Sequence, residues 1–182
     1  MAAAEKNGTA DERAEVLAIL AEQRDTLRLA VDGVTDEEAG RRTTVSELCL
    51  GGIVKHLSAV ERGWMDTLLG RPRPLPDLSS PEVQAAWRDG FRMLEGETLA
   101  GLLEDYAATA RATEEIVMGL PDLNGRSRLP EAPWFPPNAS WTARRMLLHL
   151  IRETAQHAGH ADIIREALDG ASTTMRMPVA AA

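Results

Sequence analysis

The chain has 182 residues, an apolar content of 44% and a formal net charge of −8 at pH 7. This length suits one domain with a full hydrophobic core. The negative charge argues against a general nucleic-acid binder, which needs a basic surface for phosphate contacts. The only cysteine, Cys49, excludes an internal disulfide and a CxxC metal or redox motif. Because the sequence shows neither a secretory signal pattern nor an apolar window long enough to cross a bilayer, we expect a cytoplasmic protein without a membrane partner.

Helical periodicity begins soon after the N-terminus. Residues 1–10 are predicted to form a flexible lead, and apolar residues then recur at helical spacing over 11–34, which predicts a long first helix. Thr35 followed by Glu38 has the pattern of a capping box and predicts a short helical turn. A second long helix is predicted over 46–69, where a glycine follows the last apolar residue.

A proline-rich connection separates this helix from the next ones. The stretch 71–81 cannot continue a helix, because prolines interrupt it repeatedly. Ser80 followed by Pro81 is typical of a new helix start, so a short helix is predicted over 81–93. A third long helix is predicted over 98–118, where leucines return at helical spacing.

The last third of the chain begins with an irregular segment and continues with a long helix. Residues 119–140 are rich in proline and glycine, and we expect Trp134 and Phe135 to hold this loop against the body of the protein. A fourth long helix is predicted over 140–170, and 171–182 read as a C-terminal tail.

The order of these elements predicts an all-α protein. No alternating apolar and polar pattern competes with the helices, so no strand is expected anywhere in the chain. Four long helices over 11–170 favour a four-helix bundle, with long connections between its second and third helices and between its third and fourth.

The last helix carries an unusual polar cluster on a core-directed face. At about 100° per residue, its members fall within roughly 80° of one another. Met146 and Leu150 share this face, so a carboxylate there is costly to bury without compensation, and a metal ion is the favoured partner. The members of this cluster are His149, Glu153, His157 and His160.

A further candidate ligand comes from a different helix. His56 is the only histidine outside the last helix and faces the predicted core, where a lone histidine is more often a buried neutral side chain than a ligand. Glu153 and His157 stand four residues apart and project from one side of their helix, as in helical zinc sites. Together with His56 they form a three-ligand set with an open coordination position. By spacing alone His160 could replace Glu153, and His149 and His160 are otherwise candidates for outer partners or proton carriers.

Other residues receive simpler interpretations. Trp64, Trp87 and Trp134 are interpreted as core or loop anchors, and Cys49 as a small core residue rather than a nucleophile. Arg24 falls among apolar positions of the first helix, where it could reach into a cleft and bind an anionic group.

Two segments resemble the DinB-like superfamily of metal-binding four-helix bundles, in its mycothiol-transferase-like branch, also named for mycothiol-dependent maleylpyruvate isomerase. The segments are LCLGGIVKHLSAVERGW and SWTARRMLLHLIRETAQHAGHADIIREALDG. In that branch a KHLxxVExxW pattern supplies a metal-binding histidine, which falls on His56. An ExxxH pattern followed by GH supplies the other ligands, which fall on Glu153 and His157. Other DinB-like proteins have histidine at the position of Glu153. The resemblance extends over about 11–170.

The resemblance implies a metal-dependent enzyme. A divalent metal, with zinc expected and nickel, manganese or iron as alternatives, would bind a low-molecular-weight thiol, mycothiol, and lower its pKa. The thiolate would then attack an electrophile, in a detoxification role, or add reversibly to an unsaturated acid as in thiol-dependent isomerases. His160 is the candidate catalytic residue, as a proton carrier. A homodimer is also allowed, since DinB-like bundles often pair.

Two other classes of function stay open at this point. The first is a metal-binding or ligand-binding protein without turnover, with a role in stress responses. The second is an iron(II) oxygenase built on two histidines and one carboxylate, which the fold resemblance disfavours.

Overall fold

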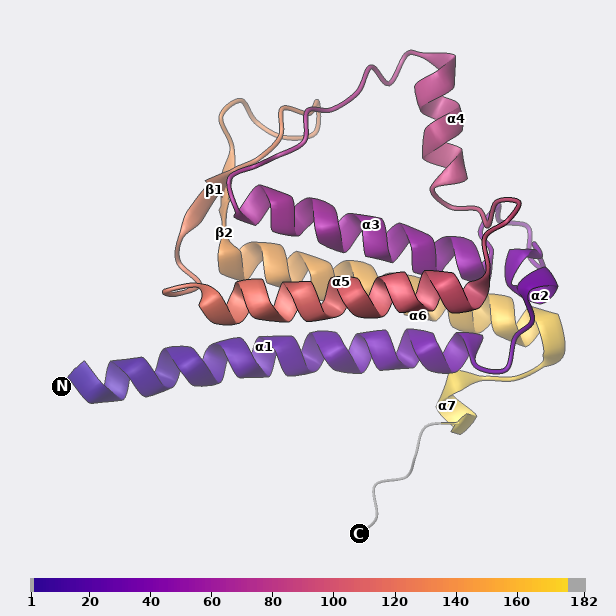
Figure 1. Ribbon diagram of the computed structural model, residues 1–182, viewed down its shortest axis with the longest axis horizontal. Coiled ribbons are helices and arrows are strands. Elements are labelled where there is room, and N and C mark those ends of the chain that lie inside the picture. The colour runs from indigo at the N-terminus through magenta and orange to yellow at the C-terminus, as the bar shows by residue number, and fades with distance from the viewer. Residues whose placement is uncertain (1, 177–182) are drawn as a thin grey trace, which may run out of the picture.

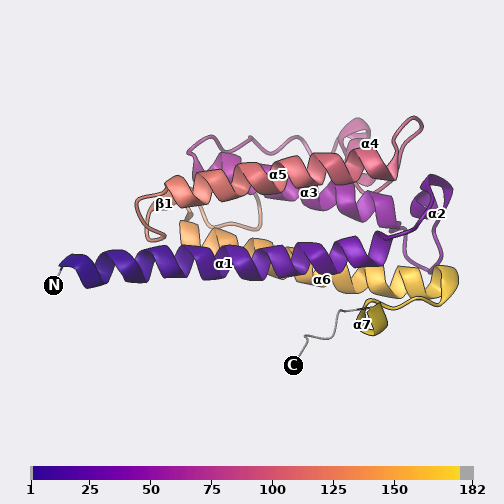
Figure 2. The same ribbon diagram turned by 60° about the horizontal axis from the view of Figure 1, so that its bottom comes forward.

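The computed structural model describes residues 2–176, with side chains described for 12–175. Among these residues, four long helices pack lengthwise into a bundle (Figure 1). The helix α1 packs most extensively on α6, and α3 on α5, so the bundle consists of two pairs of helices, which the turned view shows as two layers (Figure 2). A further contact joins α3 to α6. The long helices are α1 (Ala2–Val31), α3 (Leu50–Leu68), α5 (Leu99–Gly119) and α6 (Ala143–Asp169).

The predicted all-α bundle is confirmed, and helix caps account for several of its boundaries. Thr35 and Glu38 form the expected capping box, with the Glu38 N–H donating to Thr35 Oγ1 at 3.3 Å, at the start of α2 (Asp36–Gly40). The side chain of Ser80 caps α4 (Pro81–Asp89), as predicted. The helix α6 ends at Gly170, whose φ of +80° is a left-handed conformation that glycine adopts without strain.

Two long helices differ from their predicted limits. In the structure α1 begins at Ala2, so 2–10 continue the helix, and the division into lead, bundle and tail stays a prediction. The helix α3 begins at Leu50 rather than near residue 46. The Thr44 and Ser46 hydroxyls accept backbone N–H groups two residues further along, each at 3.2 Å, which holds this stretch in turns.

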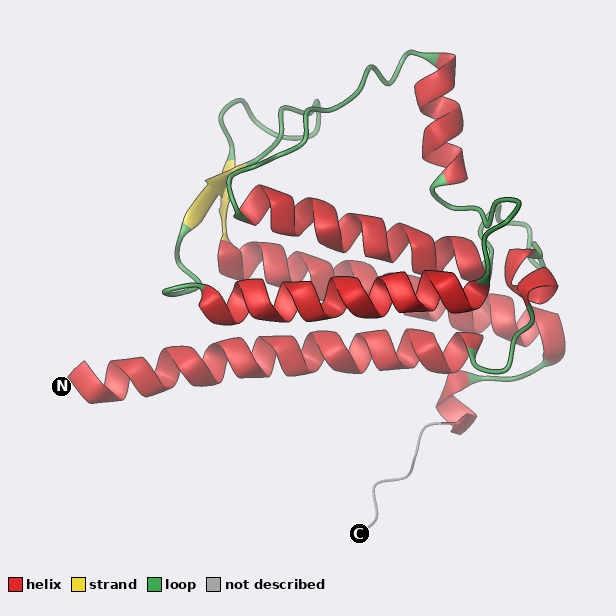
Figure 3. Ribbon diagram, viewed as in Figure 1, coloured by secondary structure: helices red, strands yellow, loops and turns green. Residues whose placement is uncertain are grey.

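The prediction that 119–140 contains no regular structure is wrong, because one strand lies inside that segment and a second begins at its last residue. The strands β1 (Arg126–Arg128) and β2 (Ser140–Thr142) pair antiparallel and form a small hairpin, coloured yellow in Figure 3. Strands of three residues are too short to show the alternating pattern by which strands are recognised in a sequence. The Ser127 hydroxyl donates to the Leu68 carbonyl at 2.8 Å, which attaches the hairpin to the end of α3.

The bundle core has an apolar cluster at each end and a buried ion pair between α1 and α3. Arg24 and Glu61 are 1% and 2% exposed, and Arg24 Nη2 donates to Glu61 Oε1 at 2.5 Å. The prediction that Arg24 binds an anion in a cleft is therefore wrong, because a carboxylate of the protein already neutralises its guanidinium inside the core.

The remaining described segment follows α6. The short helix α7 (Thr173–Arg176) is attached to it by the Thr173 N–H, which donates to Asp162 Oδ1 at 2.7 Å. Residues 177–182 of the predicted tail lie outside the described residues. None of the described helices is both long and apolar enough to span a membrane.

Candidate metal centre

The three predicted ligands come together where α3 meets α6. His56 projects from α3, and Glu153 and His157 project from α6, so the packing of these two helices forms the site. One ligand atom from each residue can be chosen so that all three lie within 4.8 Å of one another. Within residues 12–175 this is the cluster of three histidine, cysteine or acidic side chains whose atoms could hold a metal ion.

The spacing is close to what a shared ion requires. Zinc bonds to nitrogen and oxygen are about 2.0–2.2 Å long, so two ligands of one ion stand about 3–4 Å apart. His157 Nε2 lies 4.0 Å from Glu153 Oε2, and the rings of His56 and His157 have centroids 4.8 Å apart. Small side-chain rotations therefore suffice to bring all three donors onto one ion.

The protonation states suit a divalent cation. Burial, with a smaller contribution from His157, lowers the pKa of His56 to about 4. Burial also lowers the pKa of His157, and His160 adds to this effect. Both imidazoles are therefore neutral at pH 7 and keep a lone pair for a metal. Burial alone would raise the pKa of Glu153, but a hydrogen bond from Arg152 and the nearby histidines lower it overall, so the group is a carboxylate.

The two oxygens of Glu153 have different partners. Arg152 Nη2 donates to Oε1 at 2.8 Å, and His149 Nε2 lies 3.6 Å from the same oxygen. The other oxygen, Oε2, faces His157. The carboxylate is thus held through one oxygen while the other is directed toward the cluster.

His160 contacts a ligand from its outer side. Its Nδ1 lies 3.4 Å from Nδ1 of His157, whereas Nε2 of His157 faces Glu153. In the tautomer of His157 that carries its ring proton on Nδ1, this atom donates to Nδ1 of His160, and the Nε2 lone pair of His157 is available to a metal. The three-residue cluster thus consists of His56, Glu153 and His157, and His160 contacts only its His157 side.

Phe91 is a site residue that the sequence patterns do not indicate. Its ring stacks on His56 with centroids 4.0 Å apart and the planes 23° from parallel. The close approach depends on Gly52, one turn before His56, because a Cβ added there would lie 1.9 Å from the Phe91 carbonyl oxygen. In the sequence, Gly52 near His56 indicates that some other segment packs closely there. It does not indicate that this segment contains Phe91, which lies far along the chain.

An aromatic group borders the site on the Glu153 side. Trp64 stacks on Trp141 with centroids 5.0 Å apart, and both rings contact His149 edge-on. Trp64 is therefore packed as expected. Trp87 and Trp134 are 57% and 56% exposed, so the structure contradicts their interpretation as core anchors and leaves that as loop anchors.

Comparison with known proteins identifies the family and the fold of the chain. Among curated proteins none matches the chain. A crystal structure described as the conserved protein of locus from Enterococcus faecalis superposes with a TM-score of 0.64 at 14% sequence identity, covering 87% of this chain and 97% of that one, which shows a shared fold. The sequence model of the family described as Mycothiol-S-transferase matches residues 15–170. Because this match spans most of the chain, the protein belongs to the mycothiol S-transferase family and has a DinB-like fold.

Proposed function

We propose that the protein is a divalent-metal-dependent S-transferase that joins a low-molecular-weight thiol, mycothiol, to an electrophile. The observation that carries this proposal is the convergence of His56, Glu153 and His157, with ligand atoms within 4.8 Å of one another. Three protein ligands leave a coordination position open, which is typical of catalytic metal sites. Membership of the family supports the thiol as co-substrate.

Zinc is the proposed ion, because catalytic zinc sites commonly have two imidazoles and a carboxylate as ligands. The same donors also suit nickel, manganese and iron, which are the alternatives. A metal bound here would supply a Lewis acid that lowers the pKa of a thiol from its usual value of about 8.5. In the transfer, the S–H proton passes to water and the sulfur forms a bond to the electrophilic carbon. The leaving group departs with the electron pair of the broken bond.

The residues around the ligands have supporting roles in this proposal. Arg152 and His149 hold one oxygen of Glu153, which directs the other toward the ion. His160 would accept a hydrogen bond from Nδ1 of His157, and this tautomer of His157 leaves Nε2 free for the ion. This contact supports a positioning role for His160, and its catalytic role as a proton carrier stays a prediction.

Metal analysis and a transfer assay test the proposal. We expect wild-type protein to bind about one equivalent of zinc and His157→Ala to lose it. Gln156→Ala, an exposed neighbour on the same helix, is the matched control and should bind like wild type. Equal metal content in wild type and His157→Ala would contradict the ligand assignment.

The assay then measures reaction of mycothiol with 1-chloro-2,4-dinitrobenzene and with iodoacetamide. We expect the zinc-loaded wild type to accelerate at least one of these reactions over the metal-free protein. Bound metal without acceleration for either electrophile, or for a wider panel, would favour a metal-binding protein without turnover.

A further inference from the structure

A cavity lies between the segment around α4 and the loop of the β1–β2 hairpin. Its volume is about 310 Å³, at the lower end of the range of about 300–1,000 Å³ that small-molecule sites occupy. A second cavity of about 330 Å³ shares Trp87 and Arg88 with it and extends to Leu48 and Phe91. The first cavity, named here the indole cavity, is lined by Leu78, Val83, Gln84, Trp87, Arg88 and Trp134.

The indole cavity has two solvent-exposed tryptophans in its wall. Trp87 is 57% exposed and Trp134 is 56% exposed, although they come from segments far apart in the sequence. An indole is among the largest apolar surfaces a residue can bury, and aromatic rings gain further free energy by stacking. Two exposed indoles that line one cavity therefore indicate a site for a flat apolar group.

On one side, the indole cavity is linked to the metal centre through Phe91. Phe91 lies just past the end of α4, four residues after Trp87, and both residues line the second cavity. Its ring stacks on His56 at 4.0 Å. A group placed against Trp87 is thus one aromatic ring away from a predicted metal ligand.

A second series of ring contacts leads from the other wall to the same centre. Trp134 contacts Phe135 at 6.2 Å, and Phe135 contacts Trp141 at 5.5 Å. Trp141 contacts His149 at 5.5 Å, and His149 lies 3.6 Å from Glu153. Ring contacts therefore connect the Trp134 wall of the indole cavity to the metal ligands. On the Trp87 wall, Phe91 lines the adjoining cavity and stacks on His56.

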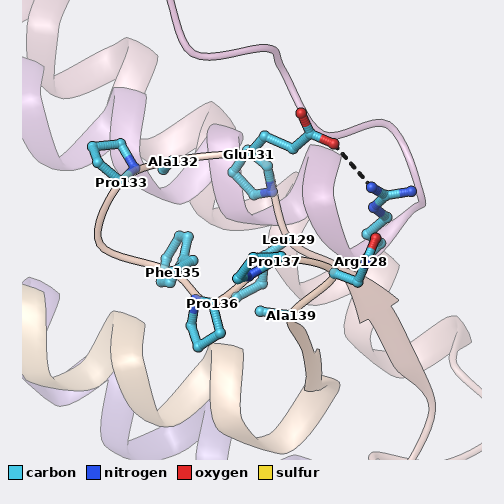
Figure 4. A pocket seen from close by; sticks show the side chains of 11 residues that line it. Arg128, Leu129, Glu131, Ala132, Pro133, Phe135, Pro136, Pro137 and Ala139 are labelled. Atoms are coloured by element: carbon cyan, nitrogen blue, oxygen red, sulfur yellow. Dashed lines mark hydrogen bonds and ion pairs between the residues drawn. The ribbon is translucent and has the colours of Figure 1, made fainter.

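The loop that carries Trp134 is stiffened by proline. Figure 4 shows Pro133, Phe135, Pro136 and Pro137 around a separate cavity of about 520 Å³ that the loop itself encloses. An ion pair between Arg128 and Glu131, 2.9 Å long, closes one side of the loop. Because proline fixes φ, the loop holds Trp134 in place with little loss of entropy when a ligand binds.

We propose that the indole cavity binds the aromatic part of the electrophile, so that the natural substrate is an aromatic electrophile rather than a small acid. This inference rests on the proposed transferase function. Arg88 lies at the rim of both cavities and adds a positive charge, which favours a ring with an anionic substituent. The reactive carbon of the substrate then points past Phe91 toward the metal centre.

Binding to the metal-free protein tests the inference without any reaction. Isothermal titration calorimetry with naphthalene-2-sulfonate is expected to give a Kd about tenfold weaker for Trp87→Ala and for Trp134→Ala than for wild type. Trp87→Phe keeps a ring and should bind within about threefold of wild type. Met118→Ala, which removes an exposed side chain on α5, is the control and should not change the Kd. Equal affinity in wild type and both alanine variants would overturn the inference.

A kinetic comparison then tests the substrate class. With zinc and mycothiol, Trp87→Ala should lower kcat/KM for 1-chloro-2,4-dinitrobenzene about tenfold and change that for iodoacetamide, which has no ring, less than about twofold. Equal losses for both electrophiles would contradict the inference. Absence of any transfer by wild type would contradict the proposed function instead, and calorimetry would still decide whether the cavity binds an aromatic ring.

Sedimentation equilibrium tests whether the two exposed indoles form a ligand site or an interface with a second copy of the chain. We expect the same oligomeric state for wild type and Trp87→Ala. A dimer that dissociates on this substitution would show that the indoles form a subunit interface, and the inference would be wrong.

Discussion

Each ligand of the candidate metal centre is held by a side chain that is not a ligand itself. Such outer contacts fix the orientation of ligands and typically change metal affinity by about 10–100-fold when they are removed. In each case the outer contact leaves the ligand within reach of the other two, with ligand atoms within 4.8 Å of one another. The pairs are Phe91 with His56, Arg152 with Glu153, and His160 with His157.

The neutral state of His56 makes the stability of the metal-free protein depend on pH. Burial lowers its pKa from an ordinary 6.5 to about 4. Between these values the unfolded chain binds a proton that the folded protein does not, so stability is present above about pH 6.5 and is lost as the pH falls toward 4. The lowered pKa values of His149 and His157 act in the same direction.

Urea unfolding of metal-free protein between pH 7 and pH 4 checks this prediction. The free energy of unfolding of wild type should fall through this range, and that of His56→Gln should fall less, because glutamine does not titrate. An equally steep fall in His56→Gln would assign the pH dependence to other groups.

The helix α3 contributes His56 to the site, and its Gly52 allows Phe91 to pack against that histidine. Gly52 lies where the backbone of Phe91 crosses α3, and there is no room for a side chain between them. Because the backbone of Phe91 has to approach α3 closely for its ring to cover His56, the glycine couples the segment after α4 to the metal centre.

Substitution of two glycines in α3 separates this contact from general helix effects. Gly52→Ala should lower the free energy of unfolding by about 1–3 kcal/mol, because the added methyl group meets the Phe91 carbonyl. It should also weaken zinc binding, since Phe91 is displaced from His56.

Gly63→Ala is the matched control on the same helix. No atom lies within 4 Å of its Cβ position, and alanine should stabilise α3 by about 0.5–1 kcal/mol. Thermal unfolding and chelator competition measure both effects. A Gly52→Ala variant as stable as Gly63→Ala would show that the backbone approach is not required.

Across the whole bundle, a buried charge pair joins α1 to α3 while apolar clusters fill the two ends. Arg24 Nη1 also lies 3.3 Å from Glu114 on α5, so one guanidinium contacts carboxylates from two other helices. Burial, with a contribution from Glu61, raises the pKa of the neighbouring Tyr106 to about 12, so its hydroxyl stays neutral. This polar layer constrains how α1 is placed along the rest of the bundle.

Removing one member of the pair should be strongly destabilising. Arg24→Met leaves Glu61 charged and buried, and we expect a loss of about 3–5 kcal/mol in the free energy of unfolding. The double variant Arg24→Met, Glu61→Leu should recover most of it. Arg73→Met, which removes a residue 71% exposed and paired with Asp66, is the control and should change stability by less than about 0.5 kcal/mol. Urea titration of wild type and the three variants measures these changes in stability, and an undiminished stability of Arg24→Met would contradict the prediction.

The sequence by itself determined the helices, several of their caps and the pairing of Glu153 with His157. These features are local, because helix propensity, capping and i, i+4 proximity depend on residues within one or two turns. The DinB-like fold could also be predicted, because the motifs around His56 and on the last helix each consist of residues close together in the sequence.

Only the tertiary structure decided which polar groups meet. The packing of α3 on α6 selected Glu153 over His160 as the neighbour of His56 and placed Phe91 over that ring. It also buried Arg24 against Glu61 and exposed Trp87 and Trp134 at one cavity. Helical periodicity tells which face a side chain is on, but contacts between helices depend on their register and on loops of irregular backbone. No pattern within a single segment carries that information.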